Sequence, residues 1–202
     1  MTAKPSIDPP FLKTWTIAIL VGQFIAAGEV AALAPLVPGP TTSILLGAVA
    51  GIVIGAAQWP CLRSMGGGTK VVEWIPASAL GGALLGGLAA GVAAGGPYDV
   101  SSITLVSLAV LAFGAAAGAL LGGAQAWALR RQSGLAPRWI AANTVGWSLG
   151  LLIALHCVLG TFLTPFSRTT VGTAAIMAAC FAATAFAVAA ATALALRPRR
   201  AA

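Results

Sequence analysis

The sequence contains the unit Gly47-Ala-Val-Ala-Gly51-Ile-Val-Ile-Gly55-Ala-Ala-Gln58-Trp59-Pro-Cys-Leu62-Arg63, which leads, after a polar stretch, to Trp74-Ile75. A second copy reads Gly114-Ala-Ala-Ala-Gly118-Ala-Leu-Leu-Gly122-Gly-Ala-Gln125-Ala-Trp127-Ala-Leu129-Arg130 and leads in the same way to Trp139-Ile140. Both copies share three glycines at a spacing of four, a glutamine, a Leu-Arg pair and a Trp-Ile pair. Repeats of this kind define architecture, and this one predicts a duplicated helical hairpin.

The composition is that of a membrane protein. Of the 202 residues, 59% are hydrophobic and 7% are charged, and the mean hydropathy is +0.96. Soluble domains carry about 25% charged residues, so this chain could not cover a surface in water. The net charge of +7 does not indicate nucleic-acid binding, because the basic residues lie in short segments between apolar runs. The three cysteines lack a CxxC or Cys/His spacing, which predicts neither a disulfide framework nor a metal site.

Six apolar segments are each long enough to cross the roughly 30 Å hydrocarbon core of a bilayer. The predicted fold is therefore all-α, with a single transmembrane domain over residues 14–196. A polar leader, residues 1–13, precedes this domain, and a basic tail, residues 197–202, follows it. The predicted spans are residues 14–37, 42–62, 74–95, 102–129, 139–163 and 169–196.

The basic residues predict how these spans are oriented. With six spans, both termini and the second and fourth loops share one side, and only Arg168 of the eleven basic residues lies on the other. An excess of Lys and Arg marks the cytoplasmic side, so both termini are predicted to be cytoplasmic. Five of the six tryptophans lie near the same helix ends, where an amphipathic ring prefers the membrane interface.

The glycine ladders predict close helix packing. Lipid tails are as apolar as leucine, so helices in a bilayer associate through small residues that let their backbones approach. Each copy holds two spans, so the copies keep one orientation and form a parallel repeat of helices 2–3 and 4–5. We expect the second and fourth helices to cross at a pseudo-twofold axis through the ladder glycines, which are Gly47, Gly51, Gly55, Gly114, Gly118 and Gly122.

The repeated pattern of a glycine-rich helix, Gln-Trp, Leu-Arg, a short loop and Trp-Ile resembles a group of functionally uncharacterised bacterial multi-pass membrane proteins. The resemblance covers about residues 47–155, and the second copy departs from it because Ala126 separates Gln125 from Trp127. It implies a location in the bacterial cytoplasmic (inner) membrane. It carries over no activity.

Glu29 and His156 are the candidate residues for ion or proton binding. An ionisable group inside a membrane span is costly and is by default a functional hypothesis. Glu29 lies about 21 Å along its helix from Trp15, and His156 reaches a similar depth on the fifth span. The two side chains could therefore form a pair. Alternatively, Glu29 is protonated or hydrogen-bonded, for example to Gln23, and only holds helices together.

His156 also admits a second interpretation. A histidine in a membrane helix can ligate a haem or a chlorophyll-type metal centre through a ring nitrogen. A single histidine cannot supply both ligands of a bis-histidine haem, and the sequence requires no cofactor. The alternative is a hydrogen-bonded structural histidine.

The repeat places a polar set at the predicted cytoplasmic ends, namely Gln58 with Arg63 and Gln125 with Arg130. Such a cluster could bind an anionic lipid head group or the acidic loop of a partner. In the other interpretation, the glutamines hydrogen-bond across the helix pair and the arginines only set the orientation.

No enzyme signature is present: the sequence lacks HExxH, GxSxG and a P-loop. We therefore expect a non-enzymatic protein without a catalytic residue or metal. The favoured role is a structural or accessory subunit that packs through its glycine-rich faces against other membrane subunits or copies of itself. The alternative is a small-solute, ion or proton transporter or channel that uses Glu29 and His156. The bilayer is a partner in both cases, and nucleic acid in neither.

Overall fold

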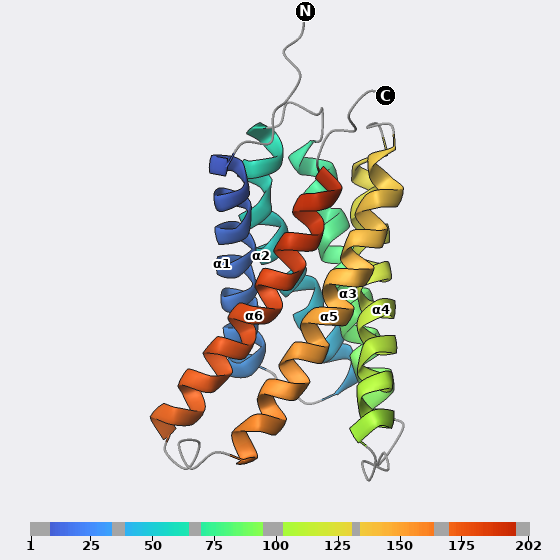
Figure 1. The fold of residues 1–202 in the computed structure, drawn as a ribbon. Coiled ribbons are helices and arrows are strands. Elements are labelled where there is room, and N and C mark those ends of the chain that lie inside the picture. Colours follow the sequence, from blue (N-terminus) through green and yellow to red (C-terminus); the bar gives the residue numbers. More distant parts are fainter. Residues whose placement is uncertain are drawn as a thin grey trace, which may run out of the picture.

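The computed structural model describes residues 9–33, 39–64, 70–94, 103–130, 134–163 and 170–196. Within these ranges the fold is all-α, as predicted, with six helices and no strand. The helices are α1 (Pro9–Leu33), α2 (Pro40–Ser64), α3 (Val71–Ala94), α4 (Ile103–Ala128), α5 (Leu135–Leu163) and α6 (Thr170–Leu196) (Figure 1).

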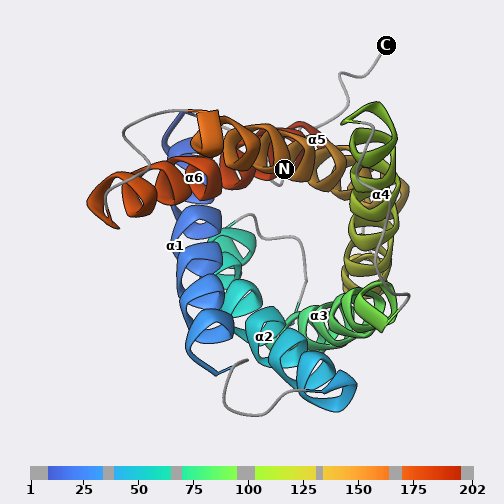
Figure 2. The ribbon, with the colours of Figure 1, turned by 90° about the horizontal axis from the view of Figure 1, so that it is seen from below.

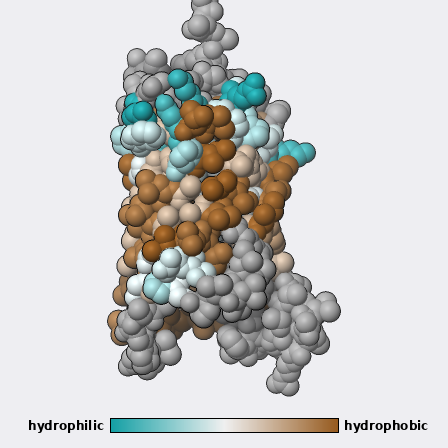
Figure 3. Space-filling view, turned by 180° about the vertical axis from the view of Figure 1, so that it is seen from behind, coloured by the Kyte–Doolittle hydropathy of each residue, from teal (hydrophilic) through white to brown (hydrophobic). Residues whose placement is uncertain are grey.

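Five of the helices are long and apolar enough to cross a membrane by length and composition, namely α2 to α6. In α1 the described apolar stretch is the shorter Phe11–Ala26. On the face seen in Figure 3, apolar side chains form a broad band across the middle of the molecule, and hydrophilic side chains gather at one end of it. These are the features of a multi-pass membrane protein.

Prolines mark several helix starts. Helix α1 begins at Pro9, earlier than the predicted start at residue 14, and α2 begins at Pro40. Proline suits the first helical turn because its missing N–H has no intrahelical partner there and its φ angle is already helical. Pro9 and Pro10, which lie within the predicted leader of residues 1–13, therefore open the first helix.

The helices form a ring in chain order (Figure 2). Each helix packs on the next, and α6 closes the ring by contacting α1. Helix α1 begins and α6 ends at the same end of this ring, where α2 and α4 also end and α3 and α5 begin (Figure 1). We call this the tryptophan end, after the three buried indoles described below.

The predicted crossing of the second and fourth helices is wrong. In the described residues the backbones of α2 and α4 do not pack against each other, and each glycine ladder instead packs on the following helix. A Cβ atom added at Gly51 would collide with the carbonyl oxygen of Ser78 on α3, and one added at Gly118 with that of Asn143 on α5. Short connections make consecutive antiparallel helices the nearest partners, so the glycines close each hairpin rather than join two hairpins.

The largest cluster of buried apolar side chains lies at the tryptophan end and draws on all six helices. It contains Trp15, Ile19, Leu62, Trp74, Leu129, Trp139, Ala189 and Leu196, among others. This end is therefore the part of the ring where all the helices are held together.

Candidate functional site

Three tryptophans fill the core of the tryptophan end. Trp15 of α1, Trp74 of α3 and Trp139 of α5 are each 0% exposed. The ring of Trp139 lies 5.7 Å from that of Trp15 and 5.7 Å from that of Trp74, at interplanar angles of 73° and 70°. These are edge-to-face geometries, which the electrostatics of aromatic rings favour. The three indoles bring together helices that are not neighbours in the ring.

Polar side chains from the even-numbered helices surround these indoles. The indole N–H of Trp139 donates to Oε1 of Gln125 at 3.0 Å, and that of Trp15 donates to Oγ1 of Thr192 at 3.0 Å. Both acceptors are buried. Thr192 in turn donates to the carbonyl oxygen of Val188 within α6.

Gln125 is the most connected side chain of this group. Its Nε2 donates to Oγ of Ser78 at 3.0 Å and to Oε1 of Gln58 at 3.4 Å, while its Oε1 accepts from Trp139. One amide thus links α4 to α2, α3 and α5. We call the set of Trp15, Ser78, Gln58, Gln125, Trp74, Trp139 and Thr192 the polar hub.

One donor in the polar hub is left over. The indole nitrogen of Trp74 is buried and has no hydrogen-bond partner among the described residues. Trp147 of α5, outside the hub, has a buried indole nitrogen in the same condition. An unpaired buried N–H costs free energy because it has lost its bond to water, and few such groups occur in natural proteins.

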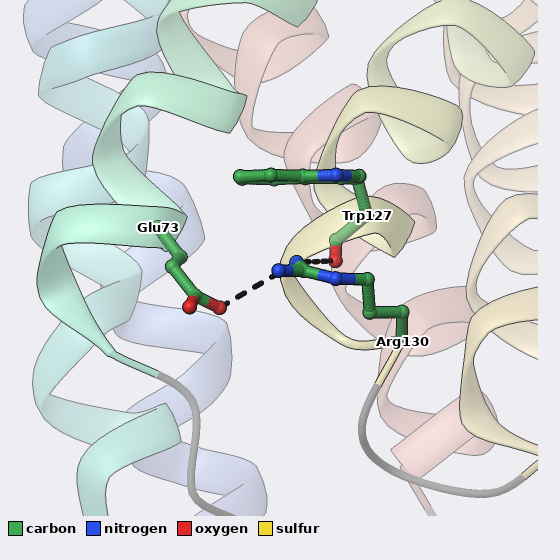
Figure 4. A network of polar contacts seen from close by, with 3 residues as sticks. All are labelled: Glu73, Trp127 and Arg130. Atoms are coloured by element: carbon green, nitrogen blue, oxygen red, sulfur yellow. Dashed lines mark hydrogen bonds and ion pairs between the residues drawn. The ribbon is translucent and has the colours of Figure 1, made fainter.

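A charged group lies at the rim of the tryptophan end. The Arg130 guanidinium lies 3.6 Å from Oε2 of Glu73 on α3 and 4.0 Å from the centre of the Trp127 ring, and it also donates to the carbonyl oxygen of Trp127 (Figure 4). Arg63, its counterpart in the first copy of the repeat, is exposed. The predicted set of two glutamines and two arginines is therefore divided between a buried amide pair and an exposed rim.

The expected pairing of Glu29 with His156 depends on a side chain that lies outside the described residues. Glu29 belongs to α1, but its side chain lies outside the described residues. His156 is exposed, and its Nδ1 lies 2.9 Å from the carbonyl oxygen of Leu152, one turn back in α5. A Glu29–His156 pair and a pigment or haem at His156 remain predictions.

A cavity of about 270 Å³ lies inside the ring. Its walls are the inner faces of α2 and α3, with Leu121 of α4 and Trp147 of α5 opposite them. The lining consists of aliphatic side chains and glycines, apart from the hydroxyl of Ser43 and the Trp147 indole. A water molecule needs two to four polar partners, and this lining offers few of them.

The chemistry available at the polar hub is limited to hydrogen bonding. Its amides, hydroxyls and indoles do not change charge near neutral pH. No group of three or more His, Cys, Asp or Glu side chains that could hold a metal ion occurs in the part of the chain that the structure describes. The hub can fix the positions of helices through hydrogen bonds between them.

Sequence reasoning singled out the glutamines of the hub but missed Trp15, Ser78 and Thr192. The signal for Trp15 was the Trp-Gly spacing of seven residues, which Trp15–Gly22 shares with Trp74–Gly81 and Trp139–Gly146. Ser78 and Thr192 carry no comparable local signal.

No protein-family model, curated protein or solved structure matches this chain.

Proposed function

We propose that this chain is a non-enzymatic structural subunit of the bacterial inner membrane, which packs as an accessory component in a larger membrane assembly. The observation that carries the proposal is the polar hub, in which three buried indoles and their polar partners tie the six helices together at one end. The hub contains no group that changes charge near neutral pH. Its chemistry suits a rigid helical scaffold.

Two glycines supply surfaces for a partner helix. A Cβ atom at Gly91 of α3 or at Gly123 of α4 would meet nothing within 4 Å, unlike one at the ladder glycines of α2 and α4. Small residues that make no contact within the ring leave room for the backbone of another helix to approach closely. Both lie in segments able to cross the membrane.

The proposed orientation places both termini in the cytoplasm, with the tryptophan end at that face. The excess of basic residues in the segments at this end supports it, because Lys and Arg are enriched on the cytoplasmic side. The proposed duplication of the α2–α3 and α4–α5 hairpins is supported by matching contacts. A Cβ atom added at Gly51 would approach the carbonyl oxygen of Ser78 and the Cα of the next residue, Ala79. One added at Gly118 would approach the carbonyl oxygen of Asn143 and the Cα of the next residue, Thr144.

Transport through Glu29 and His156 is the competing role. It needs a polar path along the ring, and the described cavity is lined almost wholly by apolar groups. Flux measured in proteoliposomes decides between the two roles. Proton or ion flux that is present in the wild type and lost in Glu29→Gln would replace the proposed function with transport.

The direct test is gentle solubilisation from native membranes, followed by size separation and mass spectrometry of the proteins that comigrate. We expect migration in an assembly larger than the chain alone. The matched variants are Gly91→Leu and Gly123→Leu, which should release partners without lowering the stability of the isolated chain. Migration of the wild type as a monomer would contradict the accessory role.

A further inference from the structure

The Leu-Arg pair that ends each copy of the repeat occurs a third time. Gln58 and Gln125 are 67 residues apart, and the same interval leads from Gln125 to Thr192. It also leads from Leu62-Arg63 to Leu129-Arg130 and then to Leu196-Arg197. Helix α6 thus has the position of α2 and α4 in the pattern, with a threonine in place of the glutamine.

The burial pattern of α6 repeats that of α4 at this interval. Trp127 and Leu194, which correspond, are each 55% exposed. Buried residues of α4 and of the position after it include Ala117, Gly118, Leu121, Gly122, Gln125, Ala126, Ala128 and Leu129. Their counterparts in α6 are buried as well: Thr184, Ala185, Val188, Ala189, Thr192, Ala193, Ala195 and Leu196. Gly114 is an exception, because it is buried and its counterpart Phe181 is 39% exposed.

The odd-numbered helices correspond in the same way. Each has a buried tryptophan, followed seven residues later by a glycine that packs on the next helix. In all three helices, a Cβ atom added at that glycine would approach the Cα of one residue on the next helix, and these three residues correspond to one another in the repeat. The pairs are Gly22 with Ile54 at 3.2 Å, Gly81 with Leu121 at 2.9 Å and Gly146 with Val188 at 3.0 Å. Ile54, Leu121 and Val188 are themselves 67 residues apart.

The hydrogen bonds of the hub follow this correspondence. Trp139 donates to Gln125 on the helix before it in the ring, and Trp15 donates to Thr192 on α6, which precedes α1 when the ring is closed. By the same rule Trp74 should donate to Gln58 of α2. In the structure Gln58 instead accepts a long bond of 3.4 Å from Gln125, and Trp74 has no partner.

We infer that the ring is built from three equivalent helix pairs about a pseudo-threefold axis at the tryptophan triad, and that α6 and α1 form the third pair. The sequence repeat does not reveal this pair, because α1, which corresponds to α3 and α5, precedes α6 in the chain instead of following it.

The sequence of the α6–α1 pair differs most from those of the other two pairs. Where α2 and α4 have three ladder glycines, α6 has Phe181, Ala185 and Ala189. The larger side chains leave less room for the backbone of α1 to approach α6. In the described residues α1 packs less extensively on α6 than α3 does on α2. Phe181 lies toward the other end of the ring and contacts Phe24 at 6.3 Å between ring centres.

Grafting between helices tests the correspondence. One variant replaces Thr184–Leu196 by the sequence of Ala117–Leu129, which keeps the interval of 67 residues and puts glutamine at position 192. The control replaces the same residues by the sequence of Ala115–Trp127, which is shifted by two positions. We expect the in-register graft to remain monodisperse in detergent and to unfold within about 5 °C of the wild type, and the shifted graft to aggregate or unfold far lower.

Equal behaviour of the two grafts, whether both fold or both fail, would overturn the inference. A single substitution tests it independently of the graft. Thr192→Gln keeps an acceptor for Trp15 and should unfold within about 3 °C of the wild type, whereas Thr192→Val removes the acceptor and should unfold lower. A larger loss for Thr192→Gln than for Thr192→Val would also contradict the inference, because a position equivalent to Gln125 accepts glutamine.

Discussion

Trp139 and Gln125 form a hydrogen bond of 3.0 Å between two helices, and both side chains are almost completely buried. Gln125 reaches Ser78 and Gln58 from the same amide, so this bond is the centre of the hub rather than an isolated contact. Side-chain hydrogen bonds between helices in membranes contribute on average about 0.6 kcal/mol, and up to about 1.7 kcal/mol. Their larger effect here is to fix which helices meet at the tryptophan end.

The tryptophans of the hub should not be equally sensitive to loss of the indole N–H. Trp139→Phe removes the donor to Gln125 and leaves a buried amide oxygen without that partner, which we expect to cost about 1–3 kcal/mol of unfolding free energy beyond the loss of ring area. Trp74→Phe removes a donor that has no partner and loses a similar ring area. Thermal unfolding in detergent should therefore show the lower midpoint for Trp139→Phe.

The Trp74 variant serves as the control for lost aromatic surface in that experiment. A midpoint for Trp74→Phe at or below that of Trp139→Phe would show that ring packing, and not the hydrogen bond to Gln125, determines the stability of this end.

The glycines of the ladders should tolerate a side chain only where the space is open. Leucine at Gly51 or Gly118 would drive α2 away from α3 or α4 away from α5, because the backbone of the partner helix occupies the place of the new Cβ atom. Overpacking of this kind costs about 1–3 kcal/mol, and more where backbone must move. We expect lower unfolding midpoints for both variants in detergent.

Gly123→Leu is the matched control on α4, since a Cβ atom there meets nothing within 4 Å. Its midpoint in the isolated chain should equal that of the wild type. If Gly118→Leu behaved like Gly123→Leu, the close α4–α5 packing would be incorrect.

Sequence reasoning succeeded where a feature depends on local composition. The number of helices followed from apolar length, and the predicted span of residues 42–62 lies within α2, which runs from Pro40 to Ser64. It failed on the partner of each glycine face. A glycine at position 118 shows that some backbone comes close, but not whether it belongs to α2 or α5, which the connection lengths and the ring decide.

The hub was only partly visible for a related reason. Gln58 and Gln125 repeat as identical residues, whereas Thr192 has the same place with a different side chain and no glycine ladder before it. Threonine and glutamine can both accept a hydrogen bond from an indole N–H, so the two positions need not hold the same amino acid. The correspondence emerges only when Trp15 is seen to donate to Thr192 as Trp139 donates to Gln125.

Two cysteines should form a disulfide under oxidising conditions. Cys180 of α6 lies close to Cys157 of α5, and nearby Thr184 donates to the carbonyl oxygen of Gly150 at 3.0 Å across the same helix pair. Treatment with a thiol oxidant such as copper phenanthroline should join the two sulfur atoms. Mass spectrometry after alkylation under denaturing conditions should then find one modified cysteine, Cys61, instead of three.

The control for this experiment is Cys157→Ser, which should leave both remaining cysteines open to alkylation after the same treatment. Alkylation of all three cysteines in the oxidised wild type would show that α5 and α6 do not bring these side chains together.

A circular permutant should keep the ring intact if α6 and α1 are one helix pair. In residues 1–202, joining the last residue to the first and opening the chain between Ser64 and Lys70 makes the third pair continuous and splits the first. The Trp15–Thr192 hydrogen bond places the two helix ends to be joined at the same end of the ring. We expect a monodisperse protein with an unfolding midpoint within about 5 °C of the wild type, because the same helix contacts form in both chains. A permutant opened inside α4, between Ala117 and Gly118, interrupts a packed helix and is expected to aggregate. Loss of folding in the first permutant as severe as in the second would show that α6 and α1 depend on their present chain order and do not form a unit like α2–α3.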